Sequence, residues 1–189
     1  MRRASPLVSG ILLALLAMPV LADGAAPAPP EEVFKQFPEL ALSGSDDYNV
    51  LFWDVYIAAL WAQEGEYAPD AVHVLVLKYE RDFEGKAIAD RSLDEIKDIG
   101  AGSAEQQASW HASMLALFPD VTEGDQLTGV HLPGEQSHFY WNGDFIGAVD
   151  DPAFGRAFFG IWLDPDTNAP GLRSKLIAGR TEDTASISP

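Results

Sequence analysis

A long apolar segment, residues 50–61, reads V-L-F-W-D-V-Y-I-A-A-L-W and contains neither glycine nor proline. Its aromatic and β-branched residues favour a strand over a helix. At a period of two, the odd-numbered side chains form one face without a polar break: Leu51, Trp53, Val55, Ile57, Ala59 and Trp61. We expect this segment to be the central strand of a sheet, with its odd-numbered face buried beneath a second layer.

Other strands are predicted on both sides of this segment. Residues 72–79 are nearly all apolar and should pair with it in antiparallel fashion. The turn-forming residues 43–47 should separate it from a short strand at residues 40–42. Downstream, turn signals at Pro133-Gly134 and Asn142-Gly143 predict a three-stranded meander at residues 126–132, 136–141 and 145–149.

Helices are predicted from their capping signals. Capping boxes at Ser92 and Ser103 indicate a short helix that Gly100 closes, followed by a longer one. The longer helix carries an apolar stripe that we expect to cover the central strand: Trp110, Met114, Leu117 and Phe118.

Shorter helices complete the pattern. A helical turn is expected at residues 31–37, a helix capped by Asp150 or Asp151 after the meander, and a last one at residues 172–177. The order of strands, helices, strands and helices predicts an α+β fold with helices on one face of an antiparallel sheet.

The N-terminus has the pattern of a signal peptide. Two arginines precede the apolar residues 11–16, and residues 20–22 offer the small residues of a cleavage site before Asp23. An N-terminal membrane anchor is the alternative. We expect a signal peptide at residues 1–22, a flexible leader at 23–37, one domain at 38–180 and a disordered tail at 181–189, in a periplasmic or secreted protein.

Charge and composition exclude several partners. The chain has a formal net charge of −17 and no cysteine. Without a basic stretch to neutralise phosphates, nucleic acid is not an expected partner. Disulfides are impossible, and no second segment is long enough for stable membrane insertion after signal cleavage.

No pattern points to catalysis or to a metal. The four histidines lie on different predicted elements without a ligand-pair spacing. Residues 164–175 begin like a calcium loop, but Ala169 and Lys175 stand where such a loop needs glycine and glutamate. We therefore expect no catalytic residue, no metal and no cofactor.

The aromatic layer between sheet and helices has two interpretations. Its side chains either interdigitate as a filled core or line a cleft for an apolar ligand. Arg81 and Arg91 flank this region and are candidates to hold a ligand carboxylate, although pairing with surface acids is their simpler role.

Five segments resemble, in order and spacing, the bacterial chalcone isomerase-like proteins: residues 52–61, 77–83 (LKYERDF), 118–125 (FPDVTEGD), 140–143 (YWNG) and 159–163 (FGIWL). The resemblance runs from about residue 40 to residue 179. It implies an open-faced β-sandwich, a large antiparallel sheet covered on one face by helices, with a ligand cleft between the layers.

The same resemblance argues against isomerase activity. True chalcone isomerases use an arginine and a threonine on early strands, and related plant proteins without that activity bind fatty acids through an arginine. This chain has no arginine between Arg3 and Arg81 and no threonine before Thr122. Leu51 stands at the position that matches the threonine, and Tyr48 stands where many bacterial relatives carry an arginine.

These observations predict an exported, non-catalytic protein that binds an apolar or amphipathic, fatty-acid-like small molecule. The alternatives are an isomerase or lyase with a rearranged site, and an envelope interaction protein with a packed interior. The residues predicted to bind the ligand are Tyr48, Leu51, Trp53, Val55, Ile57, Arg91, Trp110 and Met114.

Overall fold

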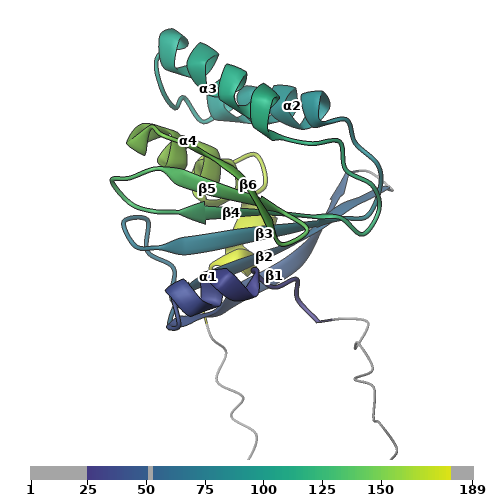
Figure 1. The fold of residues 1–189 in the computed structure, drawn as a ribbon, viewed down its shortest axis with the longest axis vertical. Helices are drawn as coiled ribbons and strands as arrows, with labels where there is room; N and C mark the ends of the chain where they lie inside the picture. The colour runs from purple at the N-terminus through teal and green to yellow at the C-terminus, as the bar shows by residue number, and fades with distance from the viewer. Residues whose placement is uncertain (1–24, 51–52, 180–189) are drawn as a thin grey trace, which may run out of the picture.

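The computed structural model describes residues 25–50 and 53–179, without the side chains of residues 50, 53 and 54. The predicted signal peptide, the predicted tail and Leu51 lie outside these residues. Six strands form one antiparallel meander in sequence order, β1-β2-β3-β4-β5-β6 (Figure 1). The strands are β1 (Leu40–Val50), β2 (Trp53–Gln63), β3 (His73–Tyr79), β4 (Gln126–His131), β5 (Ser137–Trp141) and β6 (Asp144–Val149).

Four helices contribute to the main core on one face of the sheet. They are α2 (Gly85–Asp98), α3 (Ala104–Leu117), α4 (Pro152–Leu163) and α5 (Pro170–Leu176). Helix α4 is almost wholly apolar and packs directly on the sheet, where a Cβ added at Gly129 would lie 3.0 Å from the ring of Phe159. The α+β fold with helices on a large antiparallel sheet is thus confirmed.

The first helix, α1 (Glu31–Gln36), lies on the opposite face. Its Val33 and Phe34 join a second apolar cluster with strand residues that include Trp61 and Val76. Trp61 Nε1 also donates a hydrogen bond to Pro27 O at 3.0 Å. The segment around α1 therefore covers part of a sheet face that we expected to be uncovered by helices.

This second cluster reverses the predicted orientation of β2. The even-numbered Ala58 and Leu60 face the main helical layer, whereas Trp61 faces α1. The expectation that the odd-numbered face packs under the helices was wrong along this part of the strand. The strand is also second in the sheet rather than central, since β3 and β4 lie in the middle.

Two other local predictions were wrong for reasons of tertiary packing. Residues 43–47 do not form a turn but continue β1, with a register shift between Leu42 and Gly44. Helix α2 begins at Gly85 rather than at Ser92, because Asp120, from a distant part of the chain, accepts a hydrogen bond from the Gly85 N–H at 2.8 Å.

The capping box at Ser103 and the three-stranded meander are confirmed. The Gln106 N–H donates to Ser103 Oγ at 3.2 Å, and the Ser103 N–H donates to Gln106 Oε1 at 3.0 Å. The aspartate cap of α4 is Asp151, whose Oδ1 accepts from the Ala153 N–H at 2.9 Å.

Candidate ligand cavity

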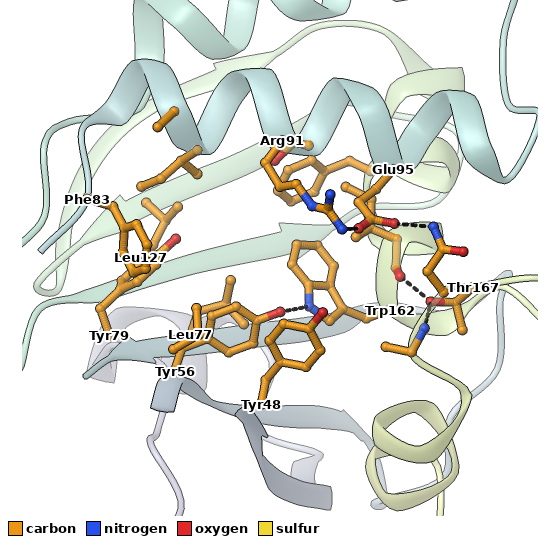
Figure 2. A pocket seen from close by; sticks show the side chains of 18 of the residues that line it. Tyr48, Tyr56, Leu77, Tyr79, Phe83, Arg91, Glu95, Leu127, Trp162 and Thr167 are labelled. Atoms are coloured by element: carbon orange, nitrogen blue, oxygen red, sulfur yellow. Dashed lines mark hydrogen bonds and ion pairs between the residues drawn. The ribbon is translucent and has the colours of Figure 1, made fainter. Parts of the chain in front are cut away.

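A cavity of about 600 Å³ lies between the sheet and the helical layer. Strands β1 to β4 supply one wall, and α2, α4 and the α4–α5 connection supply the other (Figure 2). It is lined by Tyr48, Val55, Tyr56, Leu77, Tyr79, Arg81, Phe83, Ala87, Ile88, Arg91, Ser92, Glu95, Leu127, Phe158, Ile161, Trp162, Thr167, Asn168 and Ala169.

Tyrosine rings form much of the sheet-side wall. Tyr48 stacks on Tyr56 with ring centroids 5.0 Å apart, and Tyr56 meets Tyr79 edge to face at 6.1 Å. Burial raises the pKa of both Tyr56 and Tyr79 above the ordinary value of 10.0, so both phenols are neutral at physiological pH. The sheet side of the cavity is therefore aromatic and, at these two phenols, uncharged.

Trp162 fixes the hydroxyl of Tyr56. The indole Nε1–H of Trp162 donates to Tyr56 Oη at 2.8 Å, so that oxygen acts as an acceptor from the helical side. The phenol keeps its own proton as a donor. Figure 2 shows this bond in the middle of the cavity, between the sheet and α4.

Polar groups gather at one end of the cavity. Arg91 and Glu95, one turn apart on α2, form an ion pair through Arg91 Nη2 and Glu95 Oε1. The second carboxylate oxygen, Oε2, accepts from Asn168 Nδ2 at 2.8 Å, and the same Nδ2 donates to Asp98 Oδ2 at 2.9 Å. These bonds fasten the α4–α5 connection to α2. Phe83, Leu127 and Tyr79 lie at the other end (Figure 2).

The charge of the lining is opposite to that of the whole chain. Of the described residues that line the cavity, Arg81 and Arg91 are cationic and Glu95 is anionic, which gives a net positive lining. The chain as a whole has a net charge of −17. An anion that enters the cavity thus meets a lining with a small formal positive charge in a strongly acidic protein.

Three of the predicted ligand-binding residues line this cavity: Tyr48, Val55 and Arg91. Val55 does so because β2 is irregular there. Tyr48 pairs with Tyr56 and Asn49 pairs with Asp54, which makes Val55 the extra residue of a bulge. Val55 and Tyr56 therefore both line the cavity although they are consecutive.

Three others lie elsewhere. Ile57 is one residue beyond Tyr56 on β2, so it points to the opposite face and is not part of the lining. Trp110 and Met114 are buried in the core beneath α3, and Trp110 Nε1 donates to Asp151 Oδ2 at 2.7 Å. Leu51 and the side chain of Trp53 lie outside the described residues.

The sequence analysis missed several lining residues, notably Tyr56, Tyr79, Glu95, Trp162 and Asn168. Glu95 was read as the last residue of a capping box, and Tyr56 lies on the even-numbered face of its strand, which we did not expect to pack under the helices. Arg81, noted beside Arg91 as a candidate, does line the cavity.

Two further features bear on the kind of site this is. Among residues 25–50 and 53–179, no group of three or more metal-ligating side chains is placed to hold a metal ion. In the same part of the chain, no helix combines the length and apolar character needed to cross a membrane.

Comparisons with known proteins agree with this architecture. A crystal structure of a fatty-acid binding protein from Arabidopsis thaliana superposes with a TM-score of 0.58 and 12% sequence identity, over 74% of this chain and 87% of that one. This similarity shows the fold alone. An uncharacterized protein of Haemophilus influenzae is 31% identical over 140 residues, which are 74% of this chain and 68% of the relative.

The family comparison covers nearly all the described residues. The model of the chalcone isomerase-like family matches residues 28–178, from the segment before α1 to the end of α5. The chain therefore belongs to the chalcone isomerase-like family.

Proposed function

We propose that this protein binds an amphipathic, fatty-acid-like carboxylate in the cavity and catalyses no reaction on it. The hydrocarbon part of the ligand lies among the aromatic and aliphatic side chains, and the carboxylate lies at the polar end beside Arg91. The observation that carries this proposal is the cavity itself, which has apolar walls, one polar end and a net positive lining.

The size and lining suit a small amphipathic molecule. Ligand pockets typically enclose roughly 300–1,000 Å³ and are mostly apolar, with a few polar groups that orient the ligand. The cavity of about 600 Å³ falls within that range and also supports an open cleft over a filled core. Arg91 presents a guanidinium with five N–H donors, so it can keep its bond to Glu95 and still bind a ligand carboxylate.

The fold relative supports the choice of ligand class. The Arabidopsis thaliana protein with the same fold is a fatty-acid binding protein. Two features of this chain support binding without catalysis. Tyr56 and Tyr79 are neutral phenols rather than bases, and the sequence lacks arginine and threonine on its early strands. Without preorganised donors, the electrostatic contribution to an enolate transition state is missing.

Export is a further part of the proposal. The arginines and apolar run of residues 1–22 support it. In the periplasm or outside the cell, an acidic carrier of this kind would hold a poorly soluble amphiphile in solution.

Binding of hexadecanoic acid tests the proposed function. We expect purified, delipidated protein to bind it with one-to-one stoichiometry by isothermal titration calorimetry. In Arg91→Gln, the amide can still donate to Glu95 but the charge is lost, and we expect affinity to fall about 5-fold. This is the effect of one partly exposed charge-assisted hydrogen bond, roughly 1 kcal/mol.

Arg156→Gln is the matched control. Arg156 lies on α4, pairs with the exposed Asp70 at 2.6 Å and does not line the cavity. Its variant should bind as the wild type does. The proposal fails if the wild-type protein does not bind hexadecanoic acid, and the placement of the head group fails if the two variants lose equal affinity.

A further inference from the structure

Glu95 is an unusual group to find in a cavity for a fatty acid. The residue is 8% exposed, yet its carboxylate lines the cavity. Burying a charge costs free energy unless it is paired and hydrogen-bonded. Arg91 and Asn168 each supply one contact, to Oε1 and Oε2 respectively. A carboxylate accepts about four hydrogen bonds, so these contacts leave capacity for a donor from the ligand.

The polar groups next to Glu95 already use their own hydrogen-bond donors within the protein. Asn168 Nδ2 donates to Glu95 and to Asp98, and the amide oxygen of Asn168 can accept a further hydrogen bond. The Thr167 hydroxyl donates to Ile161 O at 2.5 Å and accepts from the Ala169 N–H at 3.2 Å. The side chains of Glu95, Asn168 and Thr167 therefore offer hydrogen-bond acceptors to a ligand, and Arg91 beside them offers donors.

A simple carboxylate matches only half of this arrangement. Its carboxylate accepts from Arg91. Because Arg91 is paired with Glu95, the ligand carboxylate then lies close to the Glu95 carboxylate, and two like charges side by side repel each other. A head group with a hydroxyl beside its carboxylate matches both halves. The ligand carboxylate then accepts from Arg91 while the hydroxyl donates to Glu95.

We propose that the ligand is a hydroxy fatty acid, with a hydroxyl on the second or third carbon, and that Glu95 is the residue that selects it. This inference rests on the proposed function, because it assumes that the cavity holds an amphipathic carboxylate. Glu95 then acts as a specificity-determining residue. Its pairing with Arg91 and Asn168 holds the acceptor in place before the ligand arrives.

The test compares hexadecanoic, 2-hydroxyhexadecanoic and 3-hydroxyhexadecanoic acids in competition with a fluorescent fatty acid. We expect wild-type protein to bind at least one hydroxy acid about 10-fold more tightly than hexadecanoic acid, the effect of one hydrogen bond to a charged acceptor. In Glu95→Gln the preference should shrink to within about 2-fold, because the charged acceptor and its repulsion of the plain acid are both lost.

Asp94→Asn is the matched control. It removes the same charge from the neighbouring position of α2, where Asp94 is exposed, pairs with Lys97 at 3.2 Å and does not line the cavity. This variant should keep the wild-type preference. Circular dichroism of the wild type, Glu95→Gln and Asp94→Asn checks that all three proteins are folded.

The possible outcomes separate the two proposals. Equal wild-type affinities for the plain and hydroxy acids overturn the head-group inference and leave the proposed function standing. A preference that persists in Glu95→Gln overturns the role of Glu95. If none of the three acids binds, the proposed function itself fails. Should Glu95→Gln not fold, the wild-type ranking of the three acids still decides the identity of the head group.

Discussion

The stability of this fold should fall in mild acid because of one buried histidine. His73, at the start of β3, is 2% exposed. Its Nδ1–H donates to Ala71 O at 2.9 Å, and its Nε2 has no hydrogen-bond partner among the described residues. The ring lies 4.6 Å from that of His131. Burial, and then the neighbouring His131, lower the pKa of His73 from an ordinary 6.5 to about 3.

The direction of the pH effect follows from proton binding. In the unfolded chain His73 takes up a proton as the pH falls through about 6.5, whereas in the folded protein it stays neutral down to about 3. The unfolded state therefore binds more protons across this window, and the folded state loses stability as the pH falls. Between pH 7.5 and pH 5.0, these values correspond to a loss of about 2 kcal/mol from His73 alone. For a chain of this size, that is a decrease in Tm of roughly 4–8 °C.

The variant His73→Asn isolates this contribution. Asparagine can keep the donor to Ala71 O but cannot take up a proton, and the acidic surface titrates alike in both proteins. Urea unfolding at the two pH values should therefore show the stability advantage of the wild type shrinking by about 2 kcal/mol at pH 5.0. If the free energies of unfolding of the two proteins change in parallel with pH, His73 does not carry the acid sensitivity.

Two further predictions concern local structure. Ser103→Ala removes the side-chain acceptor that caps α3, so we expect the free energy of unfolding to fall by about 1 kcal/mol. Urea unfolding should show a lower midpoint with an unchanged m value, and an unchanged midpoint would show that the cap contributes nothing. Gly44→Ala places a Cβ only 2.0 Å from Lys175 O, a backbone atom, and should cost at least about 2 kcal/mol in the same assay. Gly171→Ala meets nothing within 4 Å and should leave stability unchanged or slightly higher, so equal losses in the two glycine variants would contradict the close approach of α5 to β1.

Local signals predicted the parts of the fold that depend on neighbours in sequence. The meander from β4 to β6 follows from its turn residues, and α3 begins where its capping box indicates. The start of α2 could not be predicted in this way. The N–H of its first residue, Gly85, is capped by Asp120, a residue 35 positions away, so the local sequence carries no starting signal.

Only part of the site was predicted, again because local signals do not show which distant residues come together. Arg91 was recognisable as one of few cations in an acidic chain, and it does line the cavity. Glu95 was not recognised, because a glutamate three residues after a serine has the pattern of a capping box. Only the packing of the α4–α5 connection, through Asn168, reveals that its carboxylate is held at the polar end of a cavity.

The face of β2 that lines the cavity was the least predictable feature, since both of its faces are covered. Ala58 and Leu60 pack under the helices, while Trp61 packs against Phe34 of α1 with ring centroids 5.3 Å apart. An apolar/polar alternation identifies a buried face only when the other face meets water. Here the even-numbered face also carries apolar residues, such as Ala58 and Leu60, and the bulge at Val55 shifts the alternation by one residue. The apolar run thus predicted a strand with one buried face, whereas the positions of α1 and of the bulge decide which of its side chains line the cavity.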